Sequence, residues 1–275
     1  DYAADVLPLT PHGNATERHM VLAYVRAAQR AVADAAAFWA EKLGLSRDQV
    51  VAQMGAAGDG PAIQNTIRAK LMKKGGVGYV APSPESFPTI EEFHQLIEAC
   101  GALPCITWLD GTSPGEQAMP ELAELLIAKG CVALNIIPDR NWNIADPAAR
   151  QHKVQQLYAV VALARELDLP LHIGTEMNAF GEKLVDEFSA PDLTPVRQAF
   201  LDGAYFIYGH TTMQRALGLG YQSAWARAYL PTRRQRNDFY TRIGYATPPG
   251  SAGLALLRRA SENAAPDEIL RQMGK

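Results

Sequence analysis

The sequence predicts an α/β protein built as a TIM-like (β/α) barrel, and two observations carry this prediction. Short apolar runs of strand length alternate with longer stretches of helical periodicity, which is typical of βαβ units and a parallel sheet. The length of 275 residues suits one such barrel. The runs supply fewer strands than a complete barrel has, so we expect a barrel that is incomplete or lacks its first strands.

Each predicted strand is a short apolar run that ends in a polar residue or a turn. The predicted strands are Val6–His12, Val77–Pro82, Leu103–Asp110, Val132–Asp139, Leu169–Asn178 and Ala204–His210. The predicted helices are Glu17–Leu43, Arg47–Met54, Ala62–Lys74, Thr89–Cys100, Met119–Lys129, Pro147–Leu167 and Thr194–Asp202. No strand-like run follows His210, so we expect a barrel domain over 1–216 and a helical C-terminal extension over 217–275 that packs on it.

Composition narrows the class of protein and its partners. With 48% hydrophobic and 20% charged residues, the chain can bury a sizeable core. A net charge of −3 argues against a nucleic-acid partner. No apolar run reaches the roughly 18 residues of a membrane helix, and three cysteines without CxxC spacing indicate reduced thiols in a cytoplasmic protein. We expect a small-molecule substrate, and a homo-oligomer stays possible.

Polar residues at the ends of the predicted strands indicate an active site. Five of the six predicted strands have such a residue at or close to their last position. These residues are His12, Asp110, Asp139, Glu176, Asn178 and His210. Because side chains alternate along a strand, His172 and Glu176 face away from Leu171 and Ile173. Active sites of α/β barrels lie at the carboxyl ends of the strands, so we expect these residues to line the mouth of the barrel.

The mixture of imidazole and carboxylate groups predicts a divalent metal ion. Such a mixture suits Zn, Mn or Fe better than Ca, which prefers oxygen ligands alone. The predicted metal ligands are His12, Glu176 and His210. A metal there would lower the pKa of a bound water towards neutrality and polarise a substrate oxygen.

The remaining polar residues at the mouth receive catalytic and substrate-binding roles. Asp110, Asp139 and Glu176 are the predicted catalytic carboxylates, with Asp110 or Asp139 as general base. Predicted substrate-binding residues are Trp108, Arg140, Asn141 and Asn178. The basic segment TRRQR, residues 232–236, is either a solvated helix face or a site for an anionic substrate.

Several of these residues also have purely structural interpretations. Asp110 precedes Gly111, and Asp-Gly is a strong turn signal. Asp139 is followed by Arg140, so the two side chains could simply pair. His12 precedes the segment GNATE and could belong to a turn. Glu176 is the hardest to assign to a turn, because glutamate is seldom a turn former.

Three segments resemble a family of barrel metallohydrolases. The three segments are PCITWLDGTSPGE (104–116), LHIGTEMNAFGEKLVDEF (171–188) and YFIYGHTTM (205–213). The pattern resembles the polymerase-and-histidinol-phosphatase (PHP) type and the wider amidohydrolase-like set of enzymes, over roughly residues 75–215. The resemblance implies divalent-metal hydrolysis, often of phosphate esters. The family's HxH pair is absent, which missing first strands would explain, and TEMN stands where the family has an Asp–His ending.

The sequence therefore favours a metal-dependent hydrolase for a small anionic substrate such as a phosphate ester. One alternative is a metal-dependent isomerase or aldolase of a sugar or sugar acid, in which Glu176 could remove a proton directly. Another is a glycosidase that pairs Glu176 with Asp110 or Asp139. A non-catalytic ligand-binding barrel is the fourth.

Overall fold

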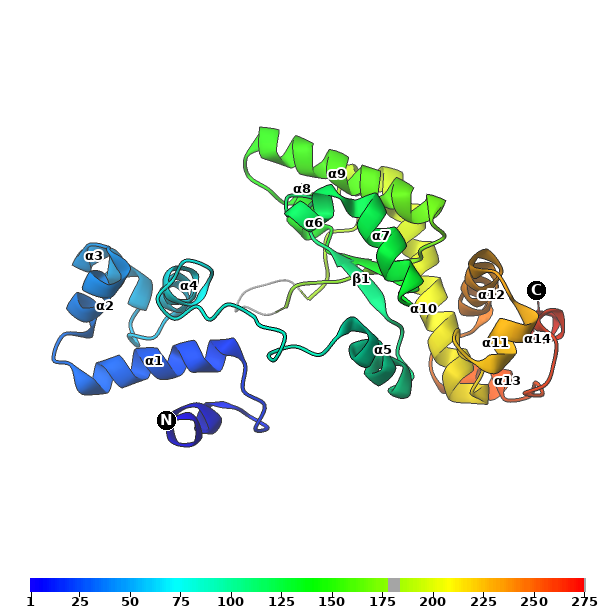
Figure 1. Ribbon diagram of the computed structural model, residues 1–275, viewed down its shortest axis with the longest axis horizontal. Coiled ribbons are helices and arrows are strands. Elements are labelled where there is room, and N and C mark those ends of the chain that lie inside the picture. The colour runs from blue at the N-terminus through cyan, green and yellow to red at the C-terminus, as the bar shows by residue number, and fades with distance from the viewer. Residues whose placement is uncertain (178–183, 275) are drawn as a thin grey trace. The chain divides into compact units, whose positions relative to one another are not determined.

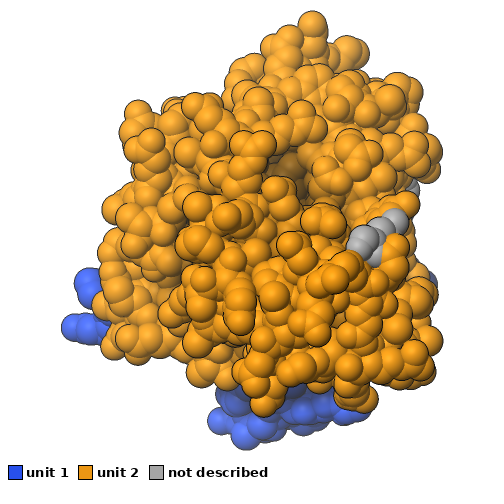
Figure 2. All heavy atoms as spheres, turned by 90° about the vertical axis from the view of Figure 1, so that its right-hand side faces the viewer, with its two compact units in different colours: residues 1–87, 179–181 blue, residues 88–178, 182–275 orange. Residues whose placement is uncertain are grey.

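The computed structural model describes residues 1–177 and 184–274, which form two compact units (Figure 1). Unit 1 contains Asp1–Phe87, and unit 2 contains the described residues from Pro88 onward. Figure 2 colours the two units separately. Each unit has a hydrophobic core of its own, so each is described by itself.

Unit 1 is helical throughout its described elements. A π-helical turn at Tyr2–Val6 and a 3₁₀ turn at Leu7–Leu9 precede α1 (Glu17–Ala31), α2 (Ala35–Leu43), α3 (Arg47–Met54) and α4 (Pro61–Ile67), which continues as a π-helical turn over Arg68–Met72. The side chain of Asp34 accepts a hydrogen bond from the Ala37 amide at the start of α2, so the predicted long helix Glu17–Leu43 is two helices. The core of unit 1 includes Val21, Val25, Trp39, Val50 and Ile63.

Unit 2 contains a small parallel sheet surrounded by helices. Its strands β1 (Cys105–Trp108), β2 (Ala133–Ile136) and β3 (Leu171–Ile173) pair in the order β1-β2-β3. The helices are α5 (Ile90–Ala99), α6 (Pro114–Gln117), α7 (Met119–Ala128), α8 (Asp139–Trp142), α9 (Pro147–Glu166), α10 (Arg197–Leu217), α11 (Ala224–Tyr229), α12 (Arg233–Ala246), α13 (Ser251–Leu257) and α14 (Pro266–Gln272), with a 3₁₀ turn at Pro191–Val196 before α10.

One face of the sheet builds the first core of unit 2. Ile106, Leu134, Ile136 and Leu171 point to this face and pack against α7 and α9. The strand order β1-β2-β3 means that the chain moves across the sheet in one direction. Right-handed crossovers in one direction place their connecting helices, here α7 and α9, on the same side of the sheet. Side chains alternate along a strand, so Asn135 and its register partners Thr107 and His172 point to the opposite face.

Helix α10 packs on β3 and on α12 through glycines. A Cβ added at Gly203 would lie 1.8 Å from the Leu171 carbonyl oxygen, and one added at Gly209 would lie 1.9 Å from the Tyr240 carbonyl oxygen. Both distances are shorter than any van der Waals contact, so these backbones meet only because the side chain is absent. The second core of unit 2 lies beside α10 and includes Phe206, Met213 and Tyr240.

The prediction of a (β/α) barrel is wrong. Among the described residues, the sheet has three strands in an open order, and most of the other regular elements are helices. The segment Ala204–His210, predicted as a strand, lies inside α10. Its apolar run was long enough for a strand, but the buried residues Phe200, Gly203, Phe206 and Gly209 recur at helical spacing across it.

Two further predicted strands are also wrong. Val6–His12 forms helical turns, and Pro8 and Pro11 in this segment lack the amide hydrogen that a ladder requires. Val77–Pro82 forms no strand, and its Val77 and Val80 are 91% and 85% exposed. Alternating apolar residues make a strand only where one face can be buried.

The predicted domain boundary at residue 216 lies within unit 2. The division into compact units falls after Phe87, while 217–275 carries the helices α11 to α14, whose residues share the second core with α10. Within the described residues, no helix combines the length and the apolar character needed to cross a membrane.

Candidate functional site

The carboxyl ends of the three strands form one edge of the sheet, which we call the carboxyl edge. It consists of Leu109–Asp110 after β1, Ile137–Asn141 after β2 and Gly174–Met177 after β3. The Gly174 amide donates to the Ile136 carbonyl at 2.8 Å, so the strand pairing continues to this edge. Open α/β sheets bind ligands outside the carboxyl ends of their strands, which makes the carboxyl edge a candidate site.

An ion pair connects the segments that follow β2 and β3. The guanidinium Nη2 of Arg140 donates to Glu176 Oε1 at 2.5 Å. The Arg140 and Glu176 side chains are 41% and 32% exposed. A pair this accessible to water contributes about 0–1 kcal/mol to stability, so a ligand can separate it at little cost.

Asp110 is bound by its neighbours at the end of β1. Its Oδ1 accepts from the Thr112 amide at 3.1 Å and hydroxyl at 2.5 Å, and its Oδ2 accepts from Lys153 Nζ of α9 at 2.7 Å. Burial opposes ionisation, but these hydrogen bonds hold the pKa of Asp110 below its ordinary value. The group is thus a structural carboxylate in a turn, and a weak base.

Helix α8 carries polar atoms that are buried without a hydrogen-bond partner among the described residues. Asn141 is fully buried, and its Nδ2 donates to the carbonyls of Leu109 at 3.0 Å and Ile137 at 3.2 Å. Its Oδ1, Asp139 Oδ1 and Trp142 Nε1 have no partner. Asn141 Nδ2 therefore joins the ends of β1 and β2, and this donor is committed to backbone carbonyls.

Two of the predicted metal ligands, Glu176 and His210, have other partners within unit 2. His12 belongs to unit 1, while Glu176 and His210 belong to unit 2. His210 is buried in α10, where its Nδ1 accepts from the Tyr221 amide at 3.0 Å, and Glu176 binds Arg140. Over residues 1–177 and 184–274, no three His, Cys, Asp or Glu side chains come together as a metal-binding group.

Of the predicted substrate-binding residues, Trp108 is buried and Asn178 is not described. Trp108 is 1% exposed and packs in the first core, on the face covered by α7 and α9. Asn178 lies outside the described residues. The carboxyl edge thus brings together Asp110, Asp139, Arg140, Asn141 and Glu176 from the predicted set.

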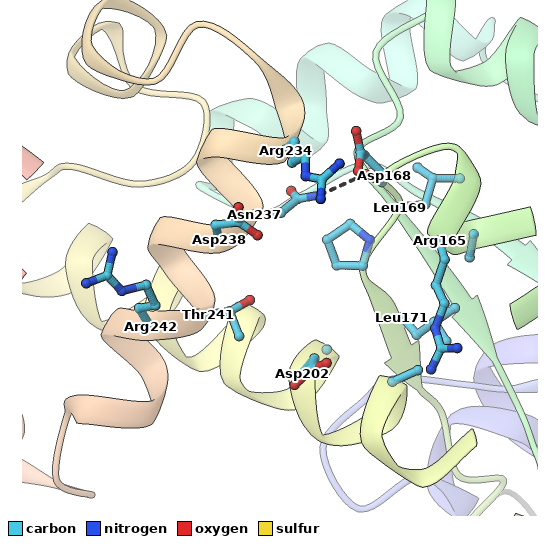
Figure 3. Close-up of a pocket in the computed structure, with 14 residues that line it drawn as sticks. Arg165, Asp168, Leu169, Leu171, Asp202, Arg234, Asn237, Asp238, Thr241 and Arg242 are labelled. Atoms are coloured by element: carbon cyan, nitrogen blue, oxygen red, sulfur yellow. Dashed lines mark hydrogen bonds between the residues drawn. The ribbon is translucent and has the colours of Figure 1, made fainter. Parts of the chain in front are cut away.

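A cavity lies elsewhere, beside the amino end of β3 (Figure 3). It measures about 690 Å³ and is lined by α9, the turn before β3, α10 and α12. Asn237 donates from Nδ2 to the Asp168 carbonyl at 2.8 Å at its rim. Three arginines face three aspartates around it, namely Arg165, Arg234, Arg242, Asp168, Asp202 and Asp238. The opposite charges are equal in number, so the lining carries no net formal charge.

Comparison with known protein families, with curated proteins and with solved structures gives no match for this chain. The resemblance to barrel metallohydrolases of the PHP type therefore stays a prediction. The function has to be inferred from the residues themselves.

Sequence reasoning missed Lys153, the cation that fixes Asp110. It lies in the first half of α9, far along the chain from the strand ends. One feature of the sequence could have indicated Lys153. The connection after a strand of a parallel sheet starts at the edge where the strands have their carboxyl ends, so the start of α9 is expected near that edge. A basic residue near that start could have been paired with a strand-end carboxylate on this ground.

Proposed function

We propose that unit 2 hydrolyses a small phosphate ester bound at the carboxyl edge. The Arg140–Glu176 ion pair is the single observation that carries this proposal. It places an anion-binding group and a potential base side by side, accessible to water, after two neighbouring parallel strands. That is where sheets of this kind bind ligands.

Arg140 would bind the phosphoryl group of the substrate. Its guanidinium stays charged at any physiological pH and offers two parallel donors that match the oxygens of a phosphate. A phosphate would replace the Glu176 carboxylate as its partner. Binding would thereby release Glu176 at the position where the reaction takes place.

Glu176 would then act as the general base. It takes a proton from a water molecule while the water oxygen forms a bond to phosphorus, and the ester P–O bond breaks. The departing alkoxide takes its proton from solvent. Asp110 is less suited to this role, since Lys153 and Thr112 already occupy both of its oxygens.

Hydrolysis kinetics test this proposal. Initial rates on a panel of phosphate monoesters would be measured for the parent, Glu176→Gln and Arg140→Gln. We expect Glu176→Gln to lower kcat by about 10²–10⁴-fold, and Arg140→Gln to raise KM more than it lowers kcat.

A matched control is the ion pair between Glu91 and Lys129, which is also in unit 2 and solvent-exposed. Glu91→Gln and Lys129→Gln should keep the parent's rates. Equal rates for the parent and Glu176→Gln would contradict the proposal. Saturable binding without turnover across the panel would favour a ligand-binding role instead.

A divalent metal ion is still a prediction from the sequence. The predicted ligands are His12, Glu176 and His210, and the proposed reaction is written for the protein's own side chains. Elemental mass spectrometry of the purified protein tests the prediction directly. Stoichiometric Zn, Mn or Fe that Glu176→Gln removes would return Glu176 to the role of a ligand.

A further inference from the structure

A second pocket, which we call the arginine pocket, lies near the amino ends of the strands, away from the carboxyl edge. It measures about 350 Å³ and is lined by the end of α5, the segment that leads into β2, and residues of α11 and α12. Three arginines line it, Arg227, Arg233 and Arg236, with Glu98 as the one lining carboxylate. This pocket is therefore strongly cationic, unlike the charge-balanced cavity of Figure 3.

The single carboxylate does not neutralise these arginines. Glu98 Oε1 accepts instead from Gln222 Nε2 at 2.9 Å. Arg236 donates from Nη1 to the carbonyls of Leu230 and Pro231 and lies over the Tyr221 ring at 5.1 Å. In the described part of the chain, none of the three arginines forms an ion pair with a carboxylate.

Two donor atoms of this cluster are buried and lack acceptors. Arg233 Nη1 and Arg236 Nε are shielded from solvent and have no hydrogen-bond partner among the described residues. A buried charged donor without an acceptor is costly to a folded protein. The cost disappears when an anion supplies the acceptor oxygens.

The position of these arginines at a helix start adds to the demand for an anion. Arg233 and Arg236 lie in the first turn of α12. That turn contains no acidic residue. The positive end of the helix dipole is there, so a cation in this turn is unfavourable and an anion favourable. Thr232 and Gln235 form a capping box, so the helix start is well formed without the arginines.

We infer that the arginine pocket binds the phosphate group of a small phosphorylated molecule. Arginine forks match phosphate oxygens in pairs, and the volume of about 350 Å³ is within the range of small-molecule sites. The pocket would hold a second ligand, separate from the substrate of the carboxyl edge. This inference does not depend on the proposed hydrolysis.

Calorimetric titration with inorganic phosphate tests the inference. The titration is made in the Arg140→Gln background, so that the carboxyl edge does not contribute and the two proposals fail independently. Adding Arg233→Gln or Arg227→Gln is expected to weaken phosphate binding at least about tenfold. Arg234→Gln is the matched control, because Arg234 is the next residue of α12 but lines the cavity of Figure 3.

Thermal unfolding separates a binding role of Arg233 from a structural one. Without phosphate, Arg233→Gln should melt at the parent's temperature or above, since it removes a buried donor without an acceptor. In the Arg140→Gln background, phosphate should raise the melting temperature, and adding Arg233→Gln should abolish that rise. The inference is overturned if phosphate gives no saturable heat, or if Arg234→Gln weakens binding as much as Arg233→Gln does.

Discussion

At the scale of single residues, the sheet face opposite the first core carries buried titratable groups in their neutral forms. Cys105 Sγ lies 3.7 Å from His172 Nδ1. Burial raises the pKa of the Cys105 thiol to about 11, and burial followed by the charge of His210 lowers the pKa of His172 to about 4. At neutral pH the pair is thus a thiol and a neutral imidazole, not a reactive thiolate and imidazolium.

The depressed pKa of His172 makes stability depend on pH. The unfolded chain takes up a proton on this imidazole near its ordinary pKa of 6.5, whereas the folded protein does so only near 4. As pH falls through that window, the free energy of unfolding should decrease by about 1–3 kcal/mol, with no further loss from this group below the window.

Urea unfolding at several pH values, followed by tryptophan fluorescence, measures this dependence. His172→Gln should flatten the slope of unfolding free energy against pH between about 4 and 6.5. His152→Gln, on the exposed side of α9, is the control and should keep the slope of the parent. A slope unchanged by His172→Gln would show that His172 is not the group responsible.

At the scale of elements, the sequence predicted the three buried strands correctly. It was wrong where apolar runs form helices or a segment without regular structure. Cys105–Trp108, Ala133–Ile136 and Leu171–Ile173 lie inside predicted strands, because each run has a face that a helix covers. Ala204–His210 is also largely apolar but belongs to α10. A seven-residue run fits either period, and only the tertiary contacts of α10 decide between them.

The crossing of α10 and α12 depends on the absence of a side chain at Gly209. A methyl group there would lie 1.9 Å from the Tyr240 carbonyl oxygen, so the two helices would have to move apart. We expect Gly209→Ala to lower the free energy of unfolding by at least about 2 kcal/mol, since a rigid backbone cannot yield as a side chain does.

Thermal unfolding followed by circular dichroism gives the comparison. Gly115→Ala in α6 is the matched control, because the nearest atom to its added Cβ is Leu122 Cδ2 at 3.7 Å, an ordinary contact. It should leave stability within about 0.5 kcal/mol of the parent. Equal melting temperatures for the two variants would refute the close crossing.

At the scale of the whole molecule, the chain is two units, each with a core of its own. The segment from Lys73 to Pro88 contains no helix or strand. Local unfolding is cheapest where few apolar contacts and hydrogen bonds hold the backbone. We expect limited trypsin digestion to cut first after Lys73 or Lys74, and to leave both units longer-lived than this segment.

Cleavage products identified by mass spectrometry report the order of the cuts. Lys153, which α9 and its bond to Asp110 protect, is the internal reference and should be cut late. Early cleavage after Lys153, with the segment from Lys73 still intact, would contradict the division into these two units.

The sequence predicted which polar residues follow β1, β2 and β3 without predicting the fold around them. Polar residues that follow parallel strands meet at one edge whether the sheet closes into a barrel or stays open. His12 and His210 were assigned to the same site through strands that the structure does not contain. The pairing of Arg140 with Glu176 could not be predicted from the sequence, because α9 and β3 separate the two residues along the chain.

The central proposal is that the carboxyl edge binds and hydrolyses a phosphate ester. Its most direct test is a crystal structure of the protein with orthovanadate, which mimics a phosphoryl group in transfer. We expect an oxyanion hydrogen-bonded to the Arg140 guanidinium, with the Glu176 carboxylate turned away from Arg140 towards the vanadium. An oxyanion found only in the arginine pocket, with the Arg140–Glu176 ion pair intact, would contradict the proposal that this edge is the site of hydrolysis.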